Sequence, residues 1–153
     1  LPLATEAAKR SSCSRRQNGA VIVKDRDVLA TGYNGTPAGV PNCDTGSCLR
    51  CAQTIQHGAG YPECICVHDL ENAIVRAARN GVAIKGATVY DTGKPCLRCT
   101  MLAMQAGIER IVYLETGEKF TTEQERLIRF VLKHSAIKVE PRADSPIVEE
   151  SCD

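Results

Sequence analysis

Two cysteines and one histidine stand at spacings that suit a metal ion. Cys96 and Cys99 lie three residues apart, directly after Pro95 and at the expected start of a helix. From the first turn of a helix both sulfurs can point at one metal, and the helix dipole favours their thiolate forms. His68, at the expected start of the preceding helix, is a third candidate ligand. Three protein ligands leave the fourth position of a tetrahedral zinc open to water, which is the arrangement of a catalytic site.

The alternative is that these three side chains are only structural. Cys96 and Cys99 would then be small buried residues, and His68 a hydrogen-bonded histidine of the core. A Cys-x-x-Cys pair alone does not decide between the two interpretations. Its combination with a histidine one strand and one helix earlier favours the metal site.

The other cysteines indicate further metal binding. The chain of 153 residues contains nine cysteines, an odd number, and it does not begin with the pattern of a secretory signal. We therefore expect metal ligands or reactive thiols rather than disulfides, with at least one structural zinc besides the catalytic one. Buried thiols without a metal are the alternative. The candidate ligands, numerous enough for more than one metal, are Cys13, Cys43, Cys48, Cys51, His57, Cys64 and Cys66.

Periodicity predicts the elements that position these residues. Apolar residues recur at helical spacing from Leu70 to Ala78, and Asn80-Gly81 ends that helix. The β-branched stretches 20–24 and 28–33 flank a charged turn, which indicates a hairpin. Residues 36–66 carry no clear period and are expected to be an irregular, Cys-rich insertion. The remaining expected elements are helices at 3–10, 96–106 and 122–134 and strands at 87–91, 111–114 and 137–139.

This order of elements predicts an α/β protein. Residues 1–141 are expected to form a single domain, and 142–153 a loosely ordered tail. The apolar content of 43% and charged content of 24% are typical of a globular chain, and no run reaches the length of a membrane span. We expect a cytoplasmic protein. The formal charge is only +1, so nucleic acid is an unlikely partner and a small substrate is favoured.

Several motifs together resemble the zinc-dependent cytidine and deoxycytidylate deaminases, above all the bacterial and phage deoxycytidylate deaminases. They occur in the family's order and spacing between residues 10 and 114. The resemblance implies a three-layer fold in which a central mixed β-sheet is flanked by helices, with zinc between the N-termini of two helices. It also implies a homo-oligomer. The matching stretches are Arg10–Cys13, Gly19–Val23, Gly32–Gly35, Asn72–Ile74, Pro95–Cys99 and Ala106–Ile108.

The resemblance fails at one catalytic position. In the family, zinc activates water for attack on the carbon that bears the amine, and a glutamate two residues after the ligand histidine shuttles the protons. Here that position holds Leu70, which has no proton to exchange. Leu70 completes an apolar stripe, so we expect it to face inward beside the zinc.

Two neighbouring acids are candidate replacements for the missing glutamate. Asp69 stands where the family usually has alanine, and it is either a pocket carboxylate or a first-turn acid that the helix dipole favours. Glu71 lies about 100° around the helix from Leu70, but it is an i+3 neighbour of His68 and could approach the imidazole. The alternative for Glu71 is a solvated position on the helix surface.

The resemblance also implies substrate contacts. Asn34 would meet a sugar, and Arg15 or Arg16 a phosphate, for which the planar fork of arginine is suited. Either arginine could equally be a solvated surface charge. Asn18 and Asp91 depart from the family's apolar or uncharged residues near the expected pocket, and both are candidates for substrate binding.

Three hypotheses of function remain open. The first is a hydrolytic deaminase of a nucleotide or related aminated heterocycle. The second is a catalytically silent zinc protein that binds a nucleotide or a partner subunit. The third is an enzyme that uses the open zinc site for different chemistry.

Overall fold

The structure is a computed structural model that describes residues 1–46, 48–52, 64–117 and 120–142. Its elements in chain order are α1 (Pro2–Ala8), β1 (Gly19–Lys24), β2 (Asp27–Tyr33), the 3₁₀ helix η1 (Cys43–Thr45), α2 (Leu49–Ala52), α3 (Asp69–Arg79), β3 (Thr88–Asp91), α4 (Leu97–Gln105), β4 (Arg110–Tyr113), α5 (Thr122–Lys133) and β5 (Lys138–Pro141). Most of the tail predicted for 142–153 lies outside the described residues.

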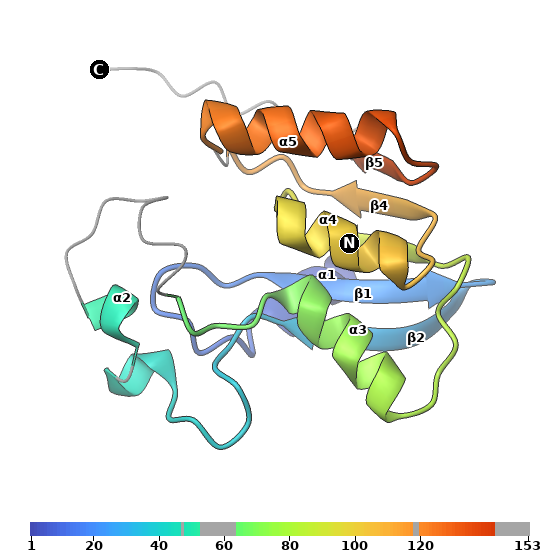
Figure 1. Cartoon of the computed structure of the whole chain (residues 1–153). Helices are drawn as coiled ribbons and strands as arrows, with labels where there is room; N and C mark the ends of the chain where they lie inside the picture. The colour runs from blue at the N-terminus through green and yellow to red at the C-terminus, as the bar shows by residue number, and fades with distance from the viewer. Residues whose placement is uncertain (47, 53–63, 118–119, 143–153) are drawn as a thin grey trace.

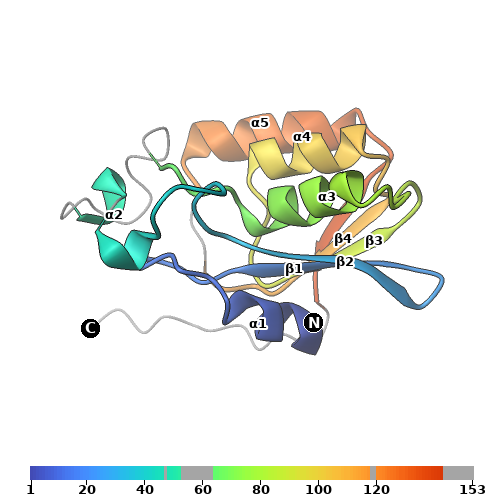
Figure 2. The same cartoon turned by 90° about the horizontal axis from the view of Figure 1, so that it is seen from below.

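Within the described residues, five strands form one mixed sheet in the order β2-β1-β3-β4-β5. The β1–β2 and β1–β3 pairs are antiparallel, whereas β3, β4 and β5 run parallel. Helix α1 packs on one face of the sheet, and α3, α4 and α5 cover the other (Figure 1 and Figure 2). The predicted three-layer fold is confirmed.

Local sequence explains the elements that hold the sheet together. The β1–β2 hairpin turns at Asp25 and Arg26, which both have positive φ, as a tight turn between twisted strands requires. Helix α5 begins with a capping box in which Thr121 Oγ1 accepts from the Gln124 N–H and the Gln124 side chain accepts from the Thr121 N–H. Among the described helices, none has the length and apolar character needed to cross a membrane.

The core lies between the sheet and the three helices on one face. It contains inward residues of β1, β3 and β4 and one side of α3 and α4, including Ile22, Leu70, Val89, Ala103 and Ile111. Leu70 is completely buried there, as its place in the apolar stripe predicts.

The described parts of the predicted insertion at 36–66 contain the short helices η1 and α2. A short antiparallel bridge joins Gly35 to Val67, the residues on either side of this segment. Cysteine side chains of the segment form a second cluster together with Cys13. Because such contacts have no periodic apolar pattern, the sequence carried no signal for these short helices.

Candidate active site

The N-termini of α3 and α4 meet at the three residues expected to bind metal. His68 and Cys96 are the residues that precede the first turns of α3 and α4. His68 Nδ1 lies 3.3 Å from Cys99 Sγ and 3.5 Å from Cys96 Sγ. All three ligand atoms lie within 4.8 Å of one another, so one nitrogen and two sulfurs could hold a metal ion.

The three groups perturb one another strongly. A hydrogen bond with Cys99 lowers the pKa of Cys96 to about 4, and His68 adds to that shift. The hydrogen bond with Cys96 raises the pKa of His68 to about 9. The same thiolate, together with burial, raises the pKa of Cys99 well above its ordinary value. A metal that binds all three groups must displace the protons of His68 and Cys99.

Leu70 and its two acidic neighbours in the first turn of α3 have different surroundings. Leu70 packs in the core, as its place in the apolar stripe predicts, in one cluster with Cys99, and it is not among the residues that line the two pockets beside the site. The helix turns Leu70 toward the sheet, and a neighbouring residue must therefore supply any carboxylate in the pocket.

Glu71 is buried rather than solvated, and it acts within its own helix end. Its Oε2 accepts a hydrogen bond of 2.9 Å from the backbone N–H of His68. Its Oε1 faces the Arg98 guanidinium at 2.6 Å, an ion pair without hydrogen-bond geometry. Glu71 thereby fixes the backbone of His68, and the spacing His68-x-x-Glu71 resembles a capping box.

Asp69 is buried in the pocket beside the metal-binding residues. Burial raises the pKa of Asp69, and a side-chain hydrogen bond with Asp91 partly offsets this shift. Both carboxyl groups line the same pocket, and the raised pKa of Asp69 favours its protonated form. The other oxygen, Asp69 Oδ2, is buried without a hydrogen-bond partner among the described residues.

We call the cavity that contains Asp69 the polar pocket. It has a volume of about 70 Å³ and connects the metal-binding residues to every substrate residue expected from the sequence. The sheet register explains why Asp91 reaches this pocket. Asp91, at the end of β3, pairs with Ala20 at the start of β1, and it therefore lies beside the loop that precedes β1. Its lining includes Arg15, Arg16, Asn18, Asn34, His68, Asp69, Asp91, Cys96 and Cys99.

The amide of Asn34 organises one wall of the polar pocket. Its Oδ1 accepts from the Asn18 N–H at 2.8 Å, and its Nδ2 donates to the Arg16 carbonyl at 2.8 Å. Asn34 thus fixes the loop that carries Arg15 and Arg16. Two further cations, Arg50 and Lys94, line the same pocket, and sequence reasoning missed both. The available signal was their position, since Lys94 precedes Pro95-Cys96 and Arg50 lies within the Cys48-x-x-Cys51 knuckle.

A second pocket of about 330 Å³ lies on the other side of His68 and Cys96. Its lining is more apolar and includes Leu97, Met101 and Phe120 together with Glu71 and Arg98. The two candidate acids therefore lie in different pockets. Only Asp69 lines a pocket together with Cys99 and the expected substrate residues.

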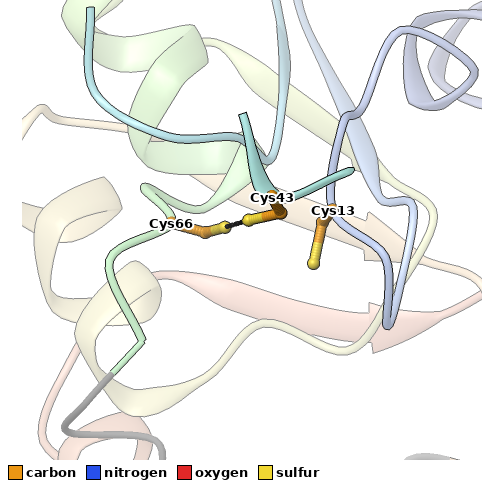
Figure 3. Close-up of side chains that lie close together, drawn as sticks. All are labelled: Cys13, Cys43 and Cys66. Atoms are coloured by element: carbon orange, nitrogen blue, oxygen red, sulfur yellow. Dashed lines mark hydrogen bonds between the residues drawn. The ribbon is translucent and has the colours of Figure 1, made fainter. Parts of the chain in front are cut away.

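The expected structural cysteines also come together. Cys13, Cys43 and Cys66 have their sulfurs within 4.8 Å of one another, and Figure 3 shows these side chains directed into one space. A second group, Cys43, Cys48 and Cys51, shares one member with the first. Cys64 packs against the same cluster. His57 lies outside the described residues.

Comparisons with known proteins agree with this fold and site. The model of the cytidine and deoxycytidylate deaminase zinc-binding region matches residues 1–115. This chain therefore belongs to that zinc-binding deaminase family.

Several relatives among curated proteins are named deoxycytidylate deaminases. The chain is 42% identical over 113 residues to the enzyme of Schizosaccharomyces pombe, covering 74% of this chain and 35% of that protein. It is 40% identical over 139 residues to that of Saccharomyces cerevisiae, covering 91% and 42%. For Mycobacterium phage D29 the identity is 43% over 118 residues, covering 74% and 89%. The chain thus spans less than half the length of the two yeast relatives.

Among solved structures, the dCMP deaminase of cyanophage S-TIM5 in complex with dCMP and dUMP has a similar fold. Its TM-score is 0.69 at 27% identity, with 92% of each chain covered. The apo form of the same enzyme gives a TM-score of 0.63.

Proposed function

We propose that this chain is a zinc-dependent hydrolytic deaminase that acts on a nucleotide of the dCMP type. The observation that carries the proposal is the polar pocket, which brings the metal-binding residues, a buried carboxyl pair and basic side chains into one cavity. Membership of the deaminase family and the names of its relatives support the same reaction class.

His68, Cys96 and Cys99 would hold the catalytic zinc, and the donor set fits that metal. One imidazole nitrogen and two thiolates are ordinary zinc ligands, and the low pKa of Cys96 supplies one of those thiolates. When bound, zinc supplies Lewis-acid activation of water. Glu71 supports the site as a positioning residue, because it fixes the His68 backbone.

Asp69 would carry the proton that the family's glutamate normally carries. It lines the polar pocket with all three metal-binding residues, and burial raises its pKa, which favours uptake of a proton. Leu70 cannot take this role from the core, and both oxygens of Glu71 face groups at the helix end.

The substrate would be recognised by the basic wall of the polar pocket. Arg15 and Arg16 lie on the loop that Asn34 fixes, and they would bind a phosphate through paired hydrogen bonds. Arg50 and Lys94 add positive charge to the same cavity. Asn18, Asn34 and Asp91 supply polar groups for the sugar and base.

Two conservative substitutions test the assignment of the proton carrier. We expect Asp69→Asn to lower kcat for ammonia release from dCMP by about 10²–10⁴-fold, the usual effect of losing a general acid–base group. Zinc content should not change. Glu71→Gln is the matched control, since glutamine also serves in capping boxes, and it should retain activity within several-fold.

Wild-type turnover in Asp69→Asn would remove Asp69 from the mechanism. If Glu71→Gln alone lost turnover at normal zinc content, Glu71 would be the carrier instead.

A silent nucleotide-binding protein is the second candidate function. The observation that favours it is the burial of Leu70 in the core, which leaves the family's shuttle position without a proton carrier. In that case wild-type protein would bind dCMP in calorimetry but release no ammonia from a panel of aminated pyrimidines, purines and pterins. Ammonia release from any member of the panel would exclude it.

We also propose that the chain forms a homo-oligomer in a reducing, cytoplasmic environment. Exposed apolar residues of α3, α4 and α5, which cover the same face of the sheet, offer a surface for a second copy (Figure 2). Sedimentation equilibrium, which measures the mass of the assembly in solution, tests the oligomeric state. Free thiols that serve as metal ligands are typical of reducing compartments.

A further inference from the structure

Six cysteines, four of them buried and two half-buried, form a cluster that is separate from the main core. Three segments far apart in sequence contribute to it: the loop after α1, the region of η1 and α2, and the residues before α3. All six are free thiols, and the shortest contact joins Cys43 Sγ to Cys66 Sγ at 3.1 Å, much longer than the roughly 2.0 Å of a disulfide (Figure 3). The six are Cys13, Cys43, Cys48, Cys51, Cys64 and Cys66.

The contacts among these thiols define two overlapping groups. The sulfurs of Cys13, Cys43 and Cys66 lie within 4.8 Å of one another, as do those of Cys43, Cys48 and Cys51, so the two sets share Cys43. Cys13 also interacts with Cys51 of the second set, and Cys64 interacts with Cys66 of the first.

We propose that this cluster binds two zinc ions through six thiolates, with Cys13 and Cys43 bridging the two metals. Cys48 and Cys51 would complete one zinc, and Cys64 and Cys66 the other. Structural zinc sites are four-coordinate, so two separate sites would need eight ligand atoms, more than the six sulfurs of the cluster. Two bridging sulfurs reduce that requirement to six, which is the number that the cluster provides.

A single mononuclear zinc explains the arrangement less well. It would use four sulfurs and leave two thiols of the same cluster without a metal. The contacts do not show which two thiols would stay unbound, because Cys48 and Cys51 interact with each other just as Cys64 and Cys66 do.

Backbone amides around the cluster point to metal-bound sulfur. The N–H groups of Arg15 and Arg16 donate to Cys13. Cys48 accepts from the N–H groups of Cys51 and Ile65. Such donors orient thiolate ligands and stabilise their negative charge.

The charge of the surroundings fits a binuclear cluster. Six thiolates and two divalent ions leave two negative charges in excess. Arg50 is only 8% exposed, and its guanidinium hydrogen-bonds with the Cys64 side chain. A buried arginine needs such a partner, so Arg50 partly neutralises the cluster while it also lines the polar pocket.

Metal content and metal–metal contact test the proposal independently of any catalytic activity. We expect anaerobically purified protein to contain three zinc ions per chain, and the His68→Ala variant to keep the two of the cluster. In that variant, X-ray absorption at the zinc edge should show a sulfur-only shell at about 2.3 Å and a zinc–zinc distance below about 4.6 Å, since the metals share ligands. A single retained zinc, or the absence of zinc–zinc scattering, would overturn the bridged cluster.

Cadmium-113 NMR distinguishes bridging from terminal cysteines. Wild-type protein loaded with ¹¹³Cd should give two signals of all-sulfur sites that are coupled to each other through the shared sulfurs. Cys51→Ala, which removes a terminal ligand, should lose one of the two signals, whereas Cys43→Ala should disturb both.

Two uncoupled signals in the wild type would contradict the proposal whether or not the variants fold. Purified wild-type protein that contained iron and absorbed visible light would also contradict the proposal, because it would hold an iron–sulfur cluster. If wild-type protein contained only the two zinc ions of the cluster, the catalytic site would be refuted and this cluster would stand, so the two failures are distinguishable.

Discussion

Gly32 lies where the first turn of α3 crosses β2 without room for a side chain. A Cβ at this position would overlap the Asp69 carbonyl oxygen and the Ala73 amide nitrogen, and it would lie only 2.9 Å from Ala73 Cβ. These neighbours are mostly backbone of a packed helix, so they cannot rotate away. Because relaxed carbon contacts begin near about 3.5 Å, α3 would have to retreat from the sheet by about 1 Å to admit alanine.

The substitution Gly32→Ala should therefore affect both stability and the site. Overpacking of this kind typically costs about 1–3 kcal/mol of unfolding free energy. The displaced turn begins directly after His68 and contains Asp69, and a misplacement of about 1 Å can cost about 100-fold in rate. We expect weaker zinc binding at the His68 site and a much lower rate of ammonia release.

Gly35→Ala is the matched control, because a Cβ there meets only Ser12 Oγ, at 3.8 Å. Urea denaturation and zinc competition with a chromophoric chelator would compare the two variants. Equal stability and equal zinc affinity in Gly32→Ala and Gly35→Ala would show that the close approach of α3 to β2 does not fix the site.

Two further predictions concern protons and packing. Zinc affinity at the His68 site should rise by about 100-fold per pH unit between roughly pH 5 and 8. The reason is that zinc must displace two protons, one from His68, whose pKa is about 9, and one from Cys99, whose pKa is raised. Cys96, with a pKa of about 4, is already ionised in this range. Chelator competition at several pH values, with His68→Ala subtracted, measures this slope, and a flat profile would contradict it. Leu70→Ala should lower the unfolding free energy by about 2–5 kcal/mol, because Leu70 is completely buried in the core. Urea denaturation measures the loss against the half-exposed control Met101→Ala, and equal losses would disprove the core position of Leu70.

The sequence predicted the regular elements because their periodicity reflects burial on one face. The helix from Leu70 to Ala78 and the hairpin around Asp25 both occur at the predicted places, within a few residues at each end. The short helices η1 and α2 were not predictable in this way. Sulfur–sulfur contacts hold their segment, and such contacts need no regular spacing of apolar residues.

The candidate site was predictable in composition but not in arrangement. The motifs name His68, Cys96 and Cys99, and the structure brings these three together. The separation of Asp69 from Glu71 depends on the direction in which the first turn of α3 presents each side chain. The proximity of Asp69 to Asp91 depends on how the first turn of α3 lies relative to the end of β3. Neither the direction nor this placement can be read from one sequence without the fold.

The hydrogen bond between Asp69 and Asp91 also constrains how this chain could have diverged from its relatives. Either aspartate alone would be a buried carboxyl without its partner, a costly intermediate for a protein of ordinary stability. The two positions, 22 residues apart in the numbering and on different elements, are therefore expected to be inherited as a pair.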